Sequence, residues 1–180
     1  MQEISSKIGV KYNKIVYWMR KYGILRRSRS EAIYIKLNPK GDPFKIKNKL
    51  NKDESFLKGL GLGLYWGEGN KANKTAVRLG NSDPKLIKLF RYFLIKICGV
   101  KKEKFKYNLL LFNDANKKKA VNFWEKELGS PTIRIGSITA LKPRGKGNYK
   151  NKSMTGVLMI EFNNIKLKKE IDKMLKLLLK

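Results

Sequence analysis

The sequence FLKGLGLGLYWGEG, which spans Phe56–Gly69, decides how the rest of this chain folds. It has the apolar spacing of a helix but contains internal glycines, each of which costs a helix about 1 kcal/mol relative to alanine. Gly59, Gly63 and Gly67 are four residues apart and therefore share one helical face. A face without side chains lets a second backbone approach closely. The stretch therefore predicts a helix that packs tightly against another helix.

Glu68 stands at the predicted C-terminus of this helix, directly before Gly69. The helix macrodipole disfavours a negative charge at that end. Two such helices packed face to face would bring two Glu68 carboxylates together, which is unfavourable unless one is protonated or a cation lies between them. Carboxylate oxygens suit a hard ion such as Mg²⁺. The alternative is an intramolecular helix pair in which Glu68 is a solvated end residue.

The segment Gly61–Gly69 resembles the LAGLIDADG motif of homing endonucleases. Gly63 and Gly67 match its two small packing positions, and Glu68 matches the final acidic position, which in that family binds the catalytic metal. Trp66 departs from the pattern at the first acidic letter. The resemblance continues through Asn81–Ile87 and covers roughly residues 52–180, although only one clear strand lies between Gly69 and Ser82 where the family usually has a hairpin. It implies an α+β fold of the LAGLIDADG type, in which helices pack on an antiparallel sheet.

The composition points to a polyanionic partner. The formal net charge is +28, from 42 basic and 14 acidic residues, and this favours nucleic acid first and an anionic membrane surface second. The absence of histidine excludes His-based catalysis and His-ligated zinc, and the single cysteine, Cys98, excludes an internal disulfide or a four-cysteine zinc site. With no signal peptide or long apolar span visible, we expect an intracellular protein (cytoplasm or nucleoid) that binds neither membrane nor zinc.

Residues 1–25 have the pattern of a helix-turn-helix. Gly9 separates two short helices and Gly23 ends the second one. The segment resembles the helix-turn-helix of resolvase-type and regulator-type DNA binders, and an ordinary helical hairpin is the alternative. In the DNA-binding interpretation these residues face the major groove: Lys11, Tyr12, Asn13, Lys14 and Tyr17. Arg20 is a further candidate for DNA binding.

Residues 26–51 are predicted to be a basic linker. Arg26, Arg27 and Arg29 could follow a phosphate strand or enter the minor groove, and a solvated linker is the alternative. The apolar pattern of Ala32–Leu37 predicts a short strand.

Residues 52–180 predict one sheet backed by helices. The expected strands are 75–80, 104–113 and a pair formed by Ile133–Leu141 and Met154–Phe162. The expected helices follow Asp53, Asp83–Pro84, Asp114 and Ile165. The other sheet face is expected to be basic and to contact DNA. The candidate DNA-contacting residues on this face and in the connector that follows Leu141 are Arg78, Lys104, Lys106, Arg134, Lys142 and Arg144.

These patterns predict a site-specific binder of double-stranded DNA. One motif per chain predicts a homodimer in which paired Glu68 carboxylates hold Mg²⁺ for phosphodiester hydrolysis. Lys71, Lys74 and Arg78 are candidates to stabilise phosphate charge. The first alternative is a helix-turn-helix transcriptional regulator with a silent LAGLIDADG-like domain, and the second is an RNA-binding or RNA-maturation protein.

Overall fold

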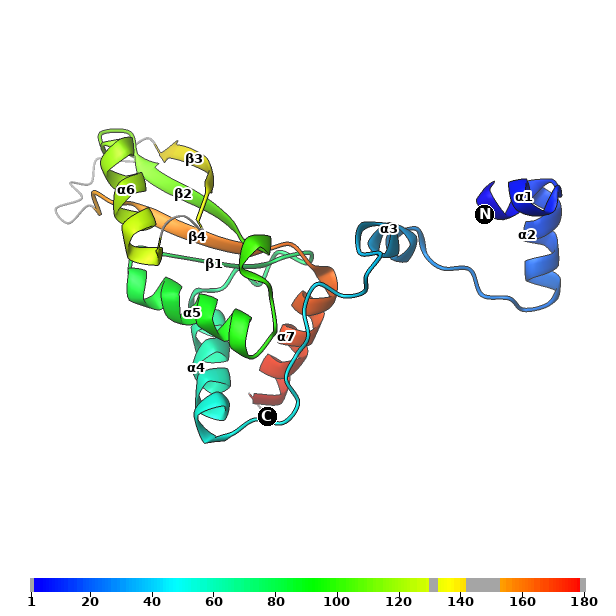
Figure 1. Ribbon diagram of the computed structural model, residues 1–180, viewed down its shortest axis with the longest axis horizontal. Coiled ribbons are helices and arrows are strands. Elements are labelled where there is room, and N and C mark those ends of the chain that lie inside the picture. The colour runs from blue at the N-terminus through cyan, green and yellow to red at the C-terminus, as the bar shows by residue number, and fades with distance from the viewer. Residues whose placement is uncertain (1, 130–132, 142–152, 179–180) are drawn as a thin grey trace. The chain divides into compact units, whose positions relative to one another are not determined.

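The structure is a computed structural model and describes residues 2–129, 133–141 and 153–178 (Figure 1). The chain divides into two units, Met1–Asp42 and Pro43–Lys180. The division falls inside the segment that the sequence marks as a linker. Each unit is described by itself.

The first unit contains the helices α1 (Gln2–Ile8), α2 (Tyr12–Lys21) and α3 (Arg29–Leu37). The two short helices predicted at the N-terminus are thus confirmed. Gly9 and Gly23 have φ values of +65° and +64°, in the left-handed region that favours glycine, and they form the turn and the end of α2. Ile15 is the one buried hydrophobic residue among the described residues of this unit.

The strand predicted at Ala32–Leu37 is wrong, because this segment belongs to α3. A capping box starts the helix: the Glu31 backbone N–H donates to Ser28 Oγ at 3.2 Å, and the Ser28 backbone N–H donates to Glu31 Oε2 at 2.7 Å. These two bonds satisfy backbone donors that a helix start otherwise leaves free. The cap thus outweighs the short apolar run that suggested a strand.

The second unit is α+β, as the sequence predicts. Its helix α4 begins after an Asn51–Glu54 capping box, and α5 begins after Asp83 with Pro84 in its first turn, as expected. The cap of α6 is Asn116 rather than the predicted Asp114. The elements are α4 (Lys52–Glu68), β1 (Val77–Asn81), α5 (Pro84–Lys96), the 3-10 helix η1 (Lys102–Lys104), β2 (Lys106–Phe112), α6 (Lys117–Leu128), β3 (Ile135–Leu141), β4 (Val157–Phe162) and α7 (Ile165–Leu178).

The four described strands form a mixed sheet in the order β1-β4-β2-β3. β4 is antiparallel to both β1 and β2, whereas β3 is parallel to β2. The expectation of an antiparallel sheet with β3 and β4 paired is therefore wrong. The physical reason is the helix α6 between β2 and β3, because a helical crossover returns the chain in the same direction.

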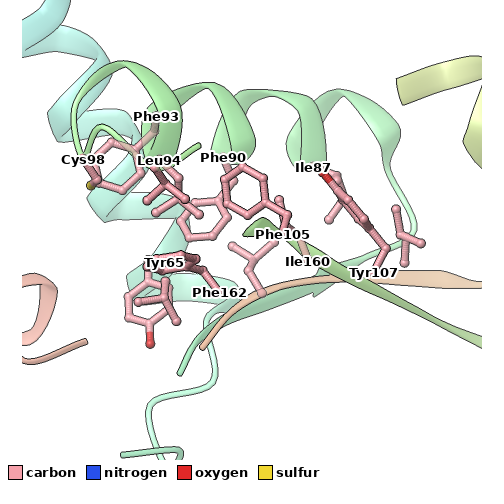
Figure 2. Packing of buried hydrophobic residues seen from close by; sticks show 14 of the residues in the cluster. Tyr65, Ile87, Phe90, Phe93, Leu94, Cys98, Phe105, Tyr107, Ile160 and Phe162 are labelled. Atoms are coloured by element: carbon pink, nitrogen blue, oxygen red, sulfur yellow. The ribbon is translucent and has the colours of Figure 1, made fainter. Parts of the chain in front are cut away.

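The core lies between the sheet and the helices, with α4 and α5 at its centre and buried residues of α6 and α7 completing it (Figures 1 and 2). Tyr65 of α4 stacks on Phe90 of α5 with ring centres 5.9 Å apart. On β2, Tyr107, Leu109 and Leu111 are buried on alternate positions, which confirms the strand predicted over residues 104–113. Cys98 is buried, and burial raises the pKa of its thiol to about 12.

Candidate functional site

The helix α4 turns one face toward the core and leaves the opposite face bare. Leu57, Gly61, Leu62 and Tyr65 are buried. On the other side, Phe56 is 72% exposed, and a Cβ added at any of the three predicted packing glycines would meet no atom within 4 Å. We call this surface the glycine face, and it consists of Phe56, Gly59, Leu60, Gly63 and Gly67, with Trp66 beside it.

A different glycine makes the close helix contact inside the unit. A Cβ at Gly61 would lie 2.2 Å from Cγ of Phe93 on α5, which is closer than real Cβ contacts allow. Sequence reasoning missed this residue because it considered only the four-residue spacing. The packing of α4 on α5 requires Gly61, whereas Gly59, Gly63 and Gly67 have no packing partner among the described residues.

Glu68 is the last residue of α4 and is exposed. Its carboxylate makes no hydrogen bond or ion pair with any residue that the structure describes. Lys71, a predicted catalytic residue, donates from Nζ to the carbonyl of Trp66 at 2.5 Å. This ammonium therefore caps the helix that ends in Glu68, where a cation is favoured by the macrodipole.

Backbone bonds fix this helix end to the sheet. Gly69 forms an isolated antiparallel bridge with Leu79, and the Asn70 backbone N–H donates to the carbonyl of Arg78 at 2.8 Å. The hydroxyl of the buried Tyr65 donates to the carbonyl of Asn70 at 3.2 Å. Glu68 is therefore attached to the edge strand β1 at the level of Arg78.

Three charged side chains occupy neighbouring positions on adjacent strands at the end of the sheet to which Glu68 is attached. They lie on the sheet face that points away from α5. Arg78 on β1 pairs with Glu161 on β4, which pairs with Lys106 on β2. Nη2 of Arg78 lies 2.5 Å from Oε2 of Glu161, which is only 5% exposed, whereas Lys106 is exposed. We call Arg78, Glu161 and Lys106 the charged row.

The expectation of a sheet face that is basic along its length is wrong. Next to the charged row, Met159 and Asn108 occupy paired positions, and Val157 pairs with Leu110 farther along. The remaining candidates do not lie on strands: Lys104 is in η1, and Arg134 precedes β3. Lys142 and Arg144 lie outside the described residues. The described positive charge on this face is therefore concentrated at the Glu68 end.

No family model, curated protein or solved structure matches this chain. The resemblance of Gly61–Gly69 to the LAGLIDADG motif stays a prediction. Across residues 2–129, 133–141 and 153–178, no three Asp, Glu, Cys or His side chains are grouped as a metal site would require. In the same residues, no helix has the length and apolar character needed to cross a membrane.

The candidate DNA-reading residues of the first unit are accessible. Lys11 precedes α2, and Tyr12, Asn13, Lys14, Tyr17 and Arg20 are exposed along it. Nζ of Lys14 lies 5.2 Å from the centre of the Trp18 ring. Arg26 and Arg27 lie between α2 and α3, and Arg29 is the first residue of α3, all three exposed. Lys74 is exposed in the loop after α4.

Proposed function

We propose that this protein is a site-specific DNA-binding homodimer of the LAGLIDADG homing-endonuclease type, and that it hydrolyses phosphodiester bonds with Mg²⁺. The observation that carries the proposal is the glycine face of α4, whose residues carry no charge, whose glycines have no neighbour in the described chain, and which ends at Gly67, directly before Glu68 in the helix.

The glycine face has an energetic cost that no contact among the described residues of a single chain offsets. Gly59, Gly63 and Gly67 each weaken the helix by about 1 kcal/mol relative to alanine. None of them makes room for another group within the described residues. A second α4 lying on this face gains close backbone contact and buries Phe56 and Leu60. A two-fold pair of this kind also brings the two Glu68 residues toward each other.

Two features support DNA as the partner. The net charge of +28 favours a polyanion, and Arg78 and Lys106 lie at the same end of the sheet as Glu68. The exposed basic and aromatic residues of α2 add a second surface with DNA-binding chemistry. A two-fold dimer is expected to prefer a roughly palindromic site.

The residues at the end of α4 fit a hard divalent cation. Glu68 offers free carboxylate oxygens, and a symmetric dimer supplies two such groups. Bound Mg²⁺ would activate water and stabilise the leaving oxygen. Lys71 is held at the helix end by its bond to the Trp66 carbonyl, where it offsets negative charge, and the exposed Lys74 is available to the phosphate.

A second candidate function is a transcriptional regulator of the same fold that does not cut DNA. The observation in its favour is the separate N-terminal unit, whose two short helices are joined by a left-handed glycine as in helix-turn-helix DNA binders.

The test measures binding and cutting together. The wild-type protein should be a dimer by light scattering, select specific duplexes from a randomised pool, and nick or cut plasmids carrying them in Mg²⁺. Glu68→Gln should abolish cutting and keep binding, while Glu103→Gln, which changes an exposed acid in η1, should alter neither. Selective binding without cutting by the wild-type protein would favour the regulator. Equal or better binding of single-stranded RNA would overturn the DNA assignment.

A further inference from the structure

Arg78 is held by a carboxylate that is otherwise hidden from solvent. The Arg78 side chain is 30% exposed, and its Nη2 lies 2.5 Å from Oε2 of the buried Glu161. Among the described residues, neither the buried Nε of Arg78 nor Oε2 of Glu161 has a hydrogen-bond partner, so the contact between the two side chains is an ion pair. The exposed part of the guanidinium is therefore the part left for a ligand, and the ion pair with Glu161 limits where that part can lie.

The ion pair changes which ligand suits this arginine. The Glu161 carboxylate offsets the guanidinium charge and repels phosphate, so the pair offers little net attraction to a DNA backbone. A guanidinium held in one orientation still presents planar N–H donors to neutral acceptors. Guanine offers two such acceptors, O6 and N7, on its major-groove edge. Lys106, on the other side of Glu161, is an exposed ammonium and suits phosphate instead.

We propose that Glu161 is a positioning residue that orients Arg78 to read a guanine in each half of the DNA target, while Lys106 contacts phosphate. This inference rests on the proposed DNA-binding function. It assigns different ligands to two cations that lie on either side of one carboxylate.

The test selects target duplexes from a randomised pool and then measures Kd over a series of salt concentrations. For the wild-type protein, replacing the selected guanine should weaken binding roughly 5- to 150-fold. Arg78→Lys keeps the charge but loses the planar donor pair, so it should remove this preference without changing the salt dependence. Glu161→Gln should also remove it, and should steepen the slope of log Kd against log salt by about one because the Arg78 charge is no longer offset.

Two control variants complete the experiment. Lys106→Met should weaken all duplexes equally and reduce the salt slope by about one, as loss of one phosphate contact requires. Arg91→Lys changes another partly buried arginine, which donates to the Leu128 carbonyl on the helical side of the unit, and should change neither property. If the Glu161→Gln variant does not fold, the guanine preference of the Arg78→Lys variant alone tests whether Arg78 reads guanine.

Several outcomes would overturn the inference. Retention of the guanine preference in Arg78→Lys or Glu161→Gln would exclude base reading by this pair. A uniform loss of affinity in Arg78→Met, with a shallower salt slope, would make Arg78 a phosphate contact. Failure of the wild-type protein to select any duplex is a different result, because it would overturn the proposed function itself.

Discussion

The ammonium group of Lys168 lies 5.7 Å from the centre of the Tyr65 ring, where α7 packs against α4. Lys168 is 2% exposed and forms an ion pair with Asp172 on the next turn of α7. The Asp172 side chain is 38% exposed, so the two partners differ strongly in their access to water. A buried ammonium is costly unless it is paired, whereas a partly solvated carboxylate is not.

The first prediction follows from this asymmetry. Asp172→Asn leaves a buried ammonium without its counter-ion and should lower the free energy of unfolding by about 3 kcal/mol. Lys168→Met fills the same space with an apolar side chain and should cost less than about 1 kcal/mol. Urea denaturation measures both, and the double variant should resemble Lys168→Met alone. A larger loss in Lys168→Met than in Asp172→Asn would contradict this account.

The second prediction compares two buried tyrosines. The Tyr65 hydroxyl donates to the Asn70 carbonyl, so Tyr65→Phe should cost about 1 kcal/mol of stability. The Tyr107 hydroxyl is buried and has no hydrogen-bond partner among the described residues. Tyr107→Phe should therefore be neutral or stabilise the fold by about 1 kcal/mol. Thermal or chemical unfolding of the two variants gives the comparison, and equal losses would show that the Tyr107 hydroxyl is satisfied.

The third prediction concerns alkaline pH. Burial raises the pKa of Tyr107 to about 12, and burial together with the nearby Asp172 raises the pKa of Tyr65 further. The unfolded chain ionises these phenols near pH 10, before the folded protein does, so their contribution to stability is present below pH 10 and is lost as pH rises toward 12. Absorbance at 295 nm should show Tyr65 and Tyr107 ionising only well above pH 10 in the folded protein. Tyr107→Phe should reduce the loss of stability between pH 10 and 12.

Local signals in the sequence predicted much of the second unit. Asp83 and Pro84 mark the start of α5 because a side-chain cap and a fixed proline φ act within a few residues. The alternation of Tyr107, Leu109 and Leu111 predicts β2 because one face of the strand is buried. The face formed by Gly59, Gly63 and Gly67 was predicted as a packing surface; none of the described residues lies within 4 Å of a Cβ added there, and its packing on a second helix stays a prediction.

The features that the sequence did not predict depend on distant parts of the chain. The helix α6 makes β3 parallel to β2, but the position of β4 between β1 and β2 depends on tertiary packing, and no local pattern predicts that strand order. The contact of Gly61 with Phe93 requires knowing how α4 lies on α5. The pairing of Arg78 with Glu161 joins positions on β1 and β4, and therefore depends on a register set by tertiary packing.

The last prediction separates the glycines that the fold needs from those that an assembly would need. Gly63→Leu adds a side chain where a Cβ has open space, so the monomer should remain folded and its helix should gain up to about 1 kcal/mol. The same side chain would separate two helices packed on the glycine face, so the dimer should dissociate at concentrations where the wild-type protein stays paired. Gly61→Ala should instead destabilise the folded monomer and leave the glycine face unchanged. Its Cβ would lie 2.2 Å from Phe93 and must disturb the packing of α4 on α5. Light scattering and thermal unfolding of the two variants measure both effects, and a fully dimeric Gly63→Leu protein would place the dimer contact elsewhere.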